Sequence, residues 1–190
     1  MSSSFLQKVA AIFKPGGLNG RAQSPAEQLY YDVLAASRQA PLFADYGVED
    51  SIDGRFDALC LLQSLMMRRL SGQEGDIKEL AQGLFDTMFM DMDLTLREMG
   101  VGDMGVGKRV KLMSEAYMGR LKSYDDAISA GDKAALSEAL RRNLFRQDDA
   151  HPKEKELADK VIAIAKRLDD MSNDAFLSGD WDKDILRLDS

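Results

Sequence analysis

The segment Leu59–Met67 constrains the fold of this chain more than any other. It reads LCLLQSLMM, so only Gln63 and Ser64 interrupt a run of apolar side chains. A helix with this pattern has no polar face to turn toward water, and it must be surrounded by other elements. The sequence therefore predicts a helix over about Ile52–Leu70 that lies at the centre of a helical bundle.

The composition indicates that the surrounding elements are helices as well. The 190 residues include 24 Leu, 21 Ala and 11 Met, but only 7 Val, 7 Ile and 2 Thr. The first three have high helix propensity, whereas β-branched residues favour strands. A chain of this length buries roughly 70% of its unfolded surface, which is enough for a substantial core. We therefore predict an all-α protein, a compact bundle of about six helices with an N-terminal amphipathic helix on a linker.

Capping signals and apolar periodicity locate the other helices of the body. Ser24-Pro25-Ala26-Glu27 is a capping box with proline in the first helical turn. Apolar residues three and four positions apart continue the pattern along the chain. The helices predicted in this way cover about 76–99 and 104–130, a stretch capped by Asp132, and a last stretch between Pro152 and Gly179.

The beginning of the chain differs from the body in charge. Residues 1–26 hold three basic residues and no acid, so they carry +3 of the net −7 and the remainder carries −10. We predict a basic amphipathic tail and linker over 1–23, an all-α domain over 24–179 and an acidic C-terminal tail over 180–190. The apolar face of the N-terminal tail either faces an anionic membrane or docks on the protein's own domain. This face consists of Phe5, Leu6, Val9, Ile12 and Phe13.

The shortage of reactive side chains excludes several classes of protein. Cys60 and His151 are the only Cys and His in the chain, which is too few for a zinc site. Nothing around His151 suggests the partner of a nucleophile, so we expect no Ser-His-Asp triad either. His151 lies in a polar run, so we predict a solvated loop histidine. The absence of a long apolar run argues against a membrane-spanning helix. We expect no catalytic residue, metal, cofactor or DNA partner.

Residues Gly102–Arg109 resemble a phosphate-binding loop in part. They read GDMGVGKR, which matches GxxxxGK, but Arg109 stands where Ser or Thr must hold magnesium. The preceding segment is also predicted to be helical, whereas a phosphate-binding loop follows a strand. We predict a corner between two helices, with Gly100 as C-cap and Asp103 as N-cap.

Acidic residues on the helix over 76–99 permit a second interpretation. Asp86 and Asp93 share one face and could hold a metal in an all-α enzyme, although an acidic face that is solvated or salt-bridged to Arg97 is the simpler explanation. The basic stretch 108–122 could likewise bind an anionic ligand or form a solvated face, with Lys111 paired to Glu115. This basic patch consists of Lys108, Arg109, Lys111 and Lys122.

Methionine is concentrated in the middle of the chain. Nine of the 11 Met residues fall between positions 66 and 118. Flexible, polarizable Met side chains fill gaps in a core, but they also form surfaces that bind apolar helices of varied sequence. Met90 and Met118 lie off the apolar stripes and are predicted to be exposed. The surface predicted here to bind an apolar helix of another protein, its client, consists of Met88, Met90, Met92, Tyr117, Met118 and Tyr124.

Several segments resemble the ubiquinol–cytochrome c chaperone family, in its α-proteobacterial form. The resemblance covers about residues 28–146 in order, and LREMGVGD at 96–103 is its most specific part. The other matching segments are Arg55-Phe56-Asp57, Arg68-Arg69-Leu70, Leu84-Phe85-Asp86, Met92-Asp93, Met118-Gly119-Arg120 with Tyr124, and Ala139–Phe145. The run Leu59–Gln63 holds no His, so no haem ligand can be transferred to it.

The resemblance implies a chaperone and not an enzyme. Members of this family assist assembly of the cytochrome bc1 complex of the respiratory chain, so the expected client is newly made cytochrome b or an assembly intermediate. A second small assembly protein is a further expected partner. The expected location is the cytoplasm, with peripheral contact to the anionic inner face of the bacterial inner membrane. The motif residues expected to order the helix corner or contact the client are Arg97, Gly100, Gly102, Asp103 and Arg120.

Residue chemistry alone leaves two other functions open. One is an all-α enzyme that depends on a metal or a phosphate ligand, bound at the acidic face or the basic corner. The other is a helical adaptor protein whose Met and Tyr stripes all lie in the core. Exposure of the Met side chains distinguishes the adaptor from a client-binding chaperone, and converging carboxylates in a closed pocket would favour the enzyme.

Overall fold

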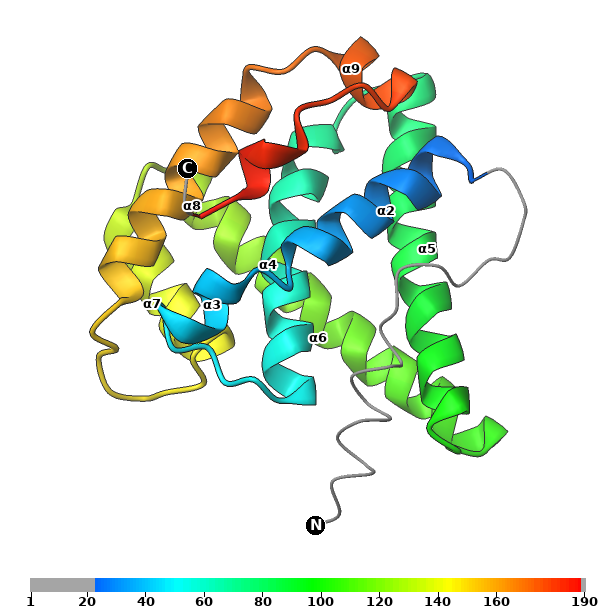
Figure 1. Ribbon diagram of the computed structural model, residues 1–190, viewed down its shortest axis with the longest axis horizontal. Helices are drawn as coiled ribbons and strands as arrows, with labels where there is room; N and C mark the ends of the chain where they lie inside the picture. The colour runs from blue at the N-terminus through cyan, green and yellow to red at the C-terminus, as the bar shows by residue number, and fades with distance from the viewer. Residues whose placement is uncertain (1–22, 189–190) are drawn as a thin grey trace.

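A computed structural model describes residues 23–188, and every regular element in this range is helical (Figure 1). The prediction of an all-α bundle is therefore confirmed. The elements are α2 (Pro25–Ala36), α3 (Ala40–Ala44), α4 (Ile52–Leu70), α5 (Asp76–Glu98), α6 (Asp103–Ser129), α7 (Lys133–Asn143), α8 (Glu154–Asp169), α9 (Asn173–Ser178) and the 3₁₀ helix η1 (Lys183–Leu186).

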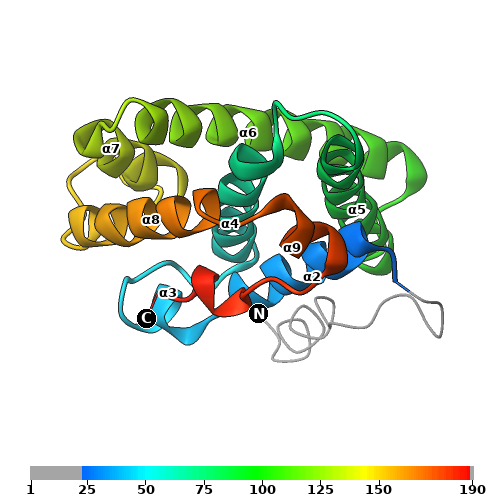
Figure 2. The same ribbon diagram turned by 90° about the horizontal axis from the view of Figure 1, so that it is seen from above.

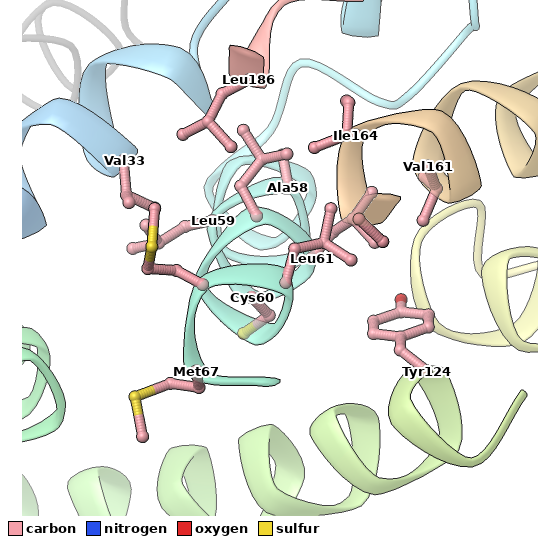
Figure 3. Close-up of a cluster of buried hydrophobic side chains, with 14 of the residues drawn as sticks. Val33, Ala58, Leu59, Cys60, Leu61, Met67, Tyr124, Val161, Ile164 and Leu186 are labelled. Atoms are coloured by element: carbon pink, nitrogen blue, oxygen red, sulfur yellow. The ribbon is translucent and has the colours of Figure 1, made fainter. Parts of the chain in front are cut away.

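Helix α4 lies at the centre of the bundle, as its sequence predicts. Every residue from Phe56 to Met67 is buried, and α2, α5, α6 and α8 all pack against this helix (Figure 2). Figure 3 shows Val33 of α2, Ile164 of α8 and Leu186 of η1 around the buried side chains of α4. Burial of each large aliphatic side chain contributes roughly 1.5–3 kcal/mol, so this layer is the main source of stability.

Local capping explains where several helices begin. The Ser24 hydroxyl accepts a hydrogen bond from the Glu27 amide at 3.2 Å, and the Glu27 carboxylate accepts one from the Ser24 amide at 2.7 Å. The predicted capping box is therefore present. Asp132 caps α7 as predicted, because its carboxylate accepts a hydrogen bond from the Ala135 amide at 2.9 Å. These bonds satisfy amides that have no partner within the first turn of a helix.

The C-terminal part of the chain differs from the prediction in two respects. The last predicted helix is two helices, α8 and α9, because the Ser172 hydroxyl accepts a hydrogen bond from the Ala175 amide and starts a new helix. Residues 180–188 are also not a separate acidic tail. Trp181, Ile185 and Leu188 are buried against the bundle, since the apolar residues between the acids have a core face to cover.

Helices α5 and α6 meet in a corner at one edge of the molecule (Figure 1). Gly100 follows α5 with a φ of +80°, a left-handed conformation that favours glycine at a helix C-terminus. Val101 and Gly102 complete the connection, and α6 then runs back across α4. None of the helices within residues 23–188 combines the length and apolar character needed to cross a bilayer.

Candidate functional site

Four of the six residues predicted to bind a client lie in the core. Met88, Met92, Tyr117 and Tyr124 are all buried, so the prediction of an exposed surface is wrong for these side chains. The reason is that they occupy the stripes by which α5 and α6 pack together and on α4. Tyr117, for example, contacts the rings of Phe85 and Phe89 of α5 at centroid distances of 6.1 and 6.0 Å.

Met90 and Met118 are exposed, which confirms the prediction made from their positions off the stripes. Exposed large apolar side chains within residues 23–188 all come from α5 and α6, and the most exposed is Met104 at 96%. Exposed apolar groups are costly unless something covers them. These two helices therefore carry the candidates for contact with an apolar partner, and the cavity between them decides among these candidates. The exposed large apolar residues are Met90, Leu94, Met104, Leu112 and Met118.

A cavity of about 350 Å³ lies between the beginning of α4, the end of α5 and the first half of α6, and we call it the methionine groove. Three methionines line it, one from the core stripe of α5, one from its C-cap and one from α6. Five of the ten other lining residues are apolar as well. The lining residues are Ile52, Phe56, Met92, Thr95, Leu96, Met99, Leu112, Met113 and Ala116, together with the charged Asp53, Arg109, Arg120 and Arg146.

The sequence predicted only some of the residues that line the methionine groove. The concentration of Met predicted the right region, and Met92 belongs to the groove although its side chain is buried. The exposure of Leu112 could have been predicted, because this residue lies off the core stripe of its helix. Nothing in the sequence predicted the place of Arg146, since it follows α7 and reaches the groove only through the tertiary fold. Met118 lies outside the methionine groove and lines a second hollow near the end of α4.

A buried carboxylate organises one wall of the methionine groove. Asp57 is fully buried and accepts hydrogen bonds from Arg120 Nη2 at 2.8 Å and from Arg146 Nε at 2.5 Å. Arg146 also donates to Asp53 at 2.9 Å, and the Arg120 guanidinium lies 5.8 Å from the centre of the Phe56 ring. We call these residues the Asp57 cluster.

The Asp57 cluster balances desolvation against ion pairing. Burial raises the pKa of the Asp57 carboxyl, and the two guanidiniums oppose that shift. The cluster also corrects the prediction for Arg120, which was expected at the α5–α6 corner. Arg120 lies more than four turns into α6, where it faces α4 instead. Its role here is to bind Asp57 and line the groove.

Arg97 orders the α5–α6 corner, as the motif suggested. Its Nε donates to Asp93 at 2.5 Å and its Nη1 donates to Asp103, so the acidic face of α5 is salt-bridged to Arg97, one of the two alternatives considered for it. The caps differ by one residue from the prediction, because Met99 is the C-cap of α5 and Gly102 is the N-cap of α6. Asp103 is the first residue of α6, and its carboxylate binds Arg97.

The four basic residues of α6 that were predicted to form a patch differ in their surroundings. Lys108, Arg109, Lys111 and Lys122 are exposed, but only Arg109 lines the methionine groove. Lys111 lies 3.9 Å from Glu115, in the predicted pair, and Lys122 lies 2.7 Å from Asp126. These two exposed pairs are typical of a solvated face, which was the alternative to an anion-binding patch.

The remaining reactive side chains have structural roles. The buried Cys60 thiol has a pKa raised by desolvation, so it stays protonated at neutral pH. Asp86 accepts a hydrogen bond from Gln82 at 2.8 Å. Within residues 23–188, no three His, Cys, Asp or Glu side chains gather closely enough to hold a metal ion.

His151 is not the solvated histidine that its polar neighbours suggested. Its ring stacks on Phe145 with the centroids 3.7 Å apart, and its Nδ1 accepts a hydrogen bond from the Lys153 amide at 3.2 Å. Partial burial lowers the pKa of His151. The polar residues around it in the sequence face water, while the ring itself packs against the end of α7.

The tail predicted to face the membrane, Phe5, Leu6, Val9, Ile12 and Phe13, lies outside the described residues. The same holds for its linker as far as residue 22.

Comparisons with known proteins identify relatives of this chain. No curated protein matches the chain. The crystal structure of the Cbp3 homolog from Brucella abortus, an α-proteobacterium, is similar to it, with 31% sequence identity and a TM-score of 0.75 over 95% of this chain and 94% of that one. Residues 44–184, which include α4, α5, α6 and the whole Asp57 cluster, match the model of the ubiquinol–cytochrome c chaperones. The chain therefore belongs to the ubiquinol–cytochrome c chaperone family.

Proposed function

We propose that this protein assists assembly of the cytochrome bc1 complex by holding an apolar segment of newly made cytochrome b in the methionine groove. Membership of the ubiquinol–cytochrome c chaperone family supports the assembly role. The choice of cytochrome b as client, and of this groove as its site, goes beyond the family assignment. The observation that carries it is an apolar, Met-lined hollow on the one pair of described helices with exposed large apolar residues.

The chemistry of the groove suits a client that must later be released. Apolar side chains entering it would lose contact with water, at roughly 25 cal/mol for each Å² buried. Met92, Met99 and Met113 can adapt to branched or aromatic side chains because the thioether has three rotatable bonds. At about 350 Å³, the groove accepts a few side chains of one helix face and leaves the rest of the client outside.

We propose further that the protein acts by binding alone, without catalysis. The carboxylates nearest the groove, Asp53 and Asp57, are engaged by Arg146 and Arg120. A carboxylate held in this way is a poor general base, because its lone pairs already accept hydrogen bonds. The same residues serve a holding role, since they keep α4, α6 and the end of α7 in fixed positions around the groove.

Photo-crosslinking in native membranes tests the groove as the client site. A crosslinking amino acid at position 112 is expected to capture cytochrome b, because Leu112 lines the groove and is exposed. The matched control is position 90, because Met90 has the same exposure but lies outside the groove lining. Equal capture from both positions, or capture from position 90 alone, would contradict the groove assignment.

A charge introduced at the same two positions extends the test to assembly. Leu112→Glu is expected to lower cytochrome b bound to the purified protein by about tenfold, since the carboxylate must be desolvated when a client covers it. Met90→Glu is expected to leave binding unchanged. Both residues are exposed, so neither change should alter the helical content measured by circular dichroism. The level of assembled bc1 complex should follow the binding.

The N-terminal tail supplies a second contact in this proposal. Residues 1–23 carry +3 and hold five large apolar residues at the spacing that one helical face would have, a combination that suits the anionic inner surface of the bacterial membrane. Such a contact would place the groove near a client that is being inserted into that membrane. Deletion of residues 1–20 is expected to abolish sedimentation with vesicles containing phosphatidylglycerol. Retained sedimentation would assign the affinity to the basic residues of α6.

A further inference from the structure

The charges that line the methionine groove do not balance. Arg109, Arg120 and Arg146 supply three guanidiniums, whereas Asp53 and the buried Asp57 behind the wall supply two carboxylates. Both carboxylates are already bound, Asp57 to Arg120 and Arg146, and Asp53 to Arg146. One positive charge is therefore left at the groove, and it belongs to Arg109.

Arg109 has no ion-pair or hydrogen-bond partner within residues 23–188. The two acids on its half of α6 are engaged elsewhere, since Asp103 binds Arg97 and Glu115 lies beside Lys111. Arg109 thus differs from the other two arginines of the groove, which are held by carboxylates of this chain.

The position of Arg109 makes that free charge matter for binding. A client segment that covers the groove takes the neighbouring apolar surface of Leu112, Met113 and Met99 out of water, and the guanidinium beside them loses solvent as well. An unpaired charge in such a place opposes binding, whereas a guanidinium paired with a carboxylate forms two parallel, charge-assisted hydrogen bonds.

We infer that the methionine groove selects client segments that carry a side-chain carboxylate next to their apolar residues, and that Arg109 binds this carboxylate. The inference rests on the proposed function of the groove and names the chemistry that its client must present. Apolar contacts with the three methionines tolerate many sequences, so they discriminate poorly between apolar helices. Arg109 supplies the discrimination, because an apolar segment without an acid leaves it unpaired.

Binding of two synthetic peptides to the full-length protein tests the inference. Both are capped helical peptides of Leu, Ala and Gln, and they differ only in a central Glu or Gln. The unmodified protein is expected to bind the Glu peptide about tenfold more tightly, measured as a ratio of Kd values by fluorescence anisotropy. Arg109→Gln is expected to remove this preference, and Arg109→Glu to transfer it to a third peptide with a central Lys.

Lys108→Gln is the matched control for Arg109→Gln. It removes the same charge one residue away, from an exposed side chain that does not line the groove. The preference for the Glu peptide should persist in this variant. Equal loss in both variants would overturn the inference, because it would show a general attraction of α6 for acidic molecules.

Failure of the inference can be told apart from failure of the proposed function. If both peptides bind equally well and Leu112→Glu weakens both, the groove binds apolar segments but Arg109 does not select among them. If neither peptide binds, the groove is not a site for apolar helices and both proposals fall. Thermal unfolding of each variant, followed by circular dichroism, confirms that exposed positions 108, 109 and 112 were changed in a folded protein.

Discussion

Two arginine–carboxylate clusters in this protein use the same chemistry, but only one of them is built around a buried carboxylate. In the Asp57 cluster the carboxylate is fully buried and Arg120 is 14% exposed, whereas at the corner Arg97 is 46% exposed. The Asp57 cluster joins three segments that are distant in the sequence, α4, α6 and the end of α7. The corner cluster joins the end of α5 to the beginning of α6, only a few residues apart.

The difference shows that burial decides what an ion pair does for a fold. Desolvation cancels much of the attraction in the Asp57 cluster, so the intact cluster adds little net stability. Loss of Asp57 or Arg120, however, leaves the other charge largely shielded from water. At the corner, water replaces a lost partner at small cost. The Asp57 cluster therefore fixes the wall of the methionine groove. The exposed cluster of Arg97 with Asp93 and Asp103 only helps to orient the turn between α5 and α6.

Removal of the central carboxylate should have the largest effect on stability. Asp57→Ala leaves Arg120 and Arg146 without their shared partner, and we expect it to lower the free energy of unfolding by about 3–5 kcal/mol. Chemical denaturation followed by circular dichroism measures this change. Because Arg120 and Arg146 line the groove, client binding should fall as well.

Asp93→Ala is the control at the exposed cluster, since it removes the same functional group from a partner of Arg97. Its denaturation midpoint should stay close to that of the unmodified protein. Similar losses for Asp57→Ala and Asp93→Ala would mean that burial does not separate the two clusters.

His151 stacks on Phe145, beside the Asp57 cluster. This histidine should make the free energy of unfolding depend on pH. Phe145 directly precedes Arg146, so this stack helps to hold the loop that carries the arginine. Burial lowers the pKa of His151 in the folded protein below the ordinary value of about 6.5. Below that pH the unfolded chain takes up a proton more readily than the folded one, so stability is lost as the pH falls through the folded pKa.

Replacement of His151 by Phe isolates this contribution. The variant keeps an aromatic ring against Phe145 but cannot take up a proton. We expect the unmodified protein to lose more stability than the variant between about pH 7 and pH 5, by less than the effect of Asp57→Ala, because His151 is only partly buried. Parallel stability curves for the two proteins over this range would exclude His151 as the source.

Removal of the exposed guanidinium should have the smallest effect. Arg97→Ala breaks contacts to Asp93 and Asp103, but water can reach all three side chains. The midpoint of thermal unfolding should therefore change little, and the difference from the unmodified protein should shrink further in high salt. A shift as large as that of Asp57→Ala would show that burial does not decide how much an ion pair contributes to the stability of this fold.

The elements of the fold could be predicted where a local signal exists. The capping bonds of Ser24 and Asp132 and the apolar run of α4 act within a few residues, so those helices follow from neighbours in the chain. The break between α8 and α9 was missed because the apolar stripe continues through it. The burial of Trp181 was missed because its acidic neighbours in the sequence indicated a solvent-exposed tail.

The candidate site was less predictable, for a geometric reason. A stripe of Met and Tyr residues has the same spacing whether it faces a core or a client, and only the packing of α5 and α6 on α4 assigned Met88 and Tyr117 to the core. The sequence by itself determined an all-α bundle around one apolar helix, because periodicity and capping are local. The tertiary structure decided which surface stayed open, since Asp57, Arg120 and Arg146 meet only when three distant segments fold together.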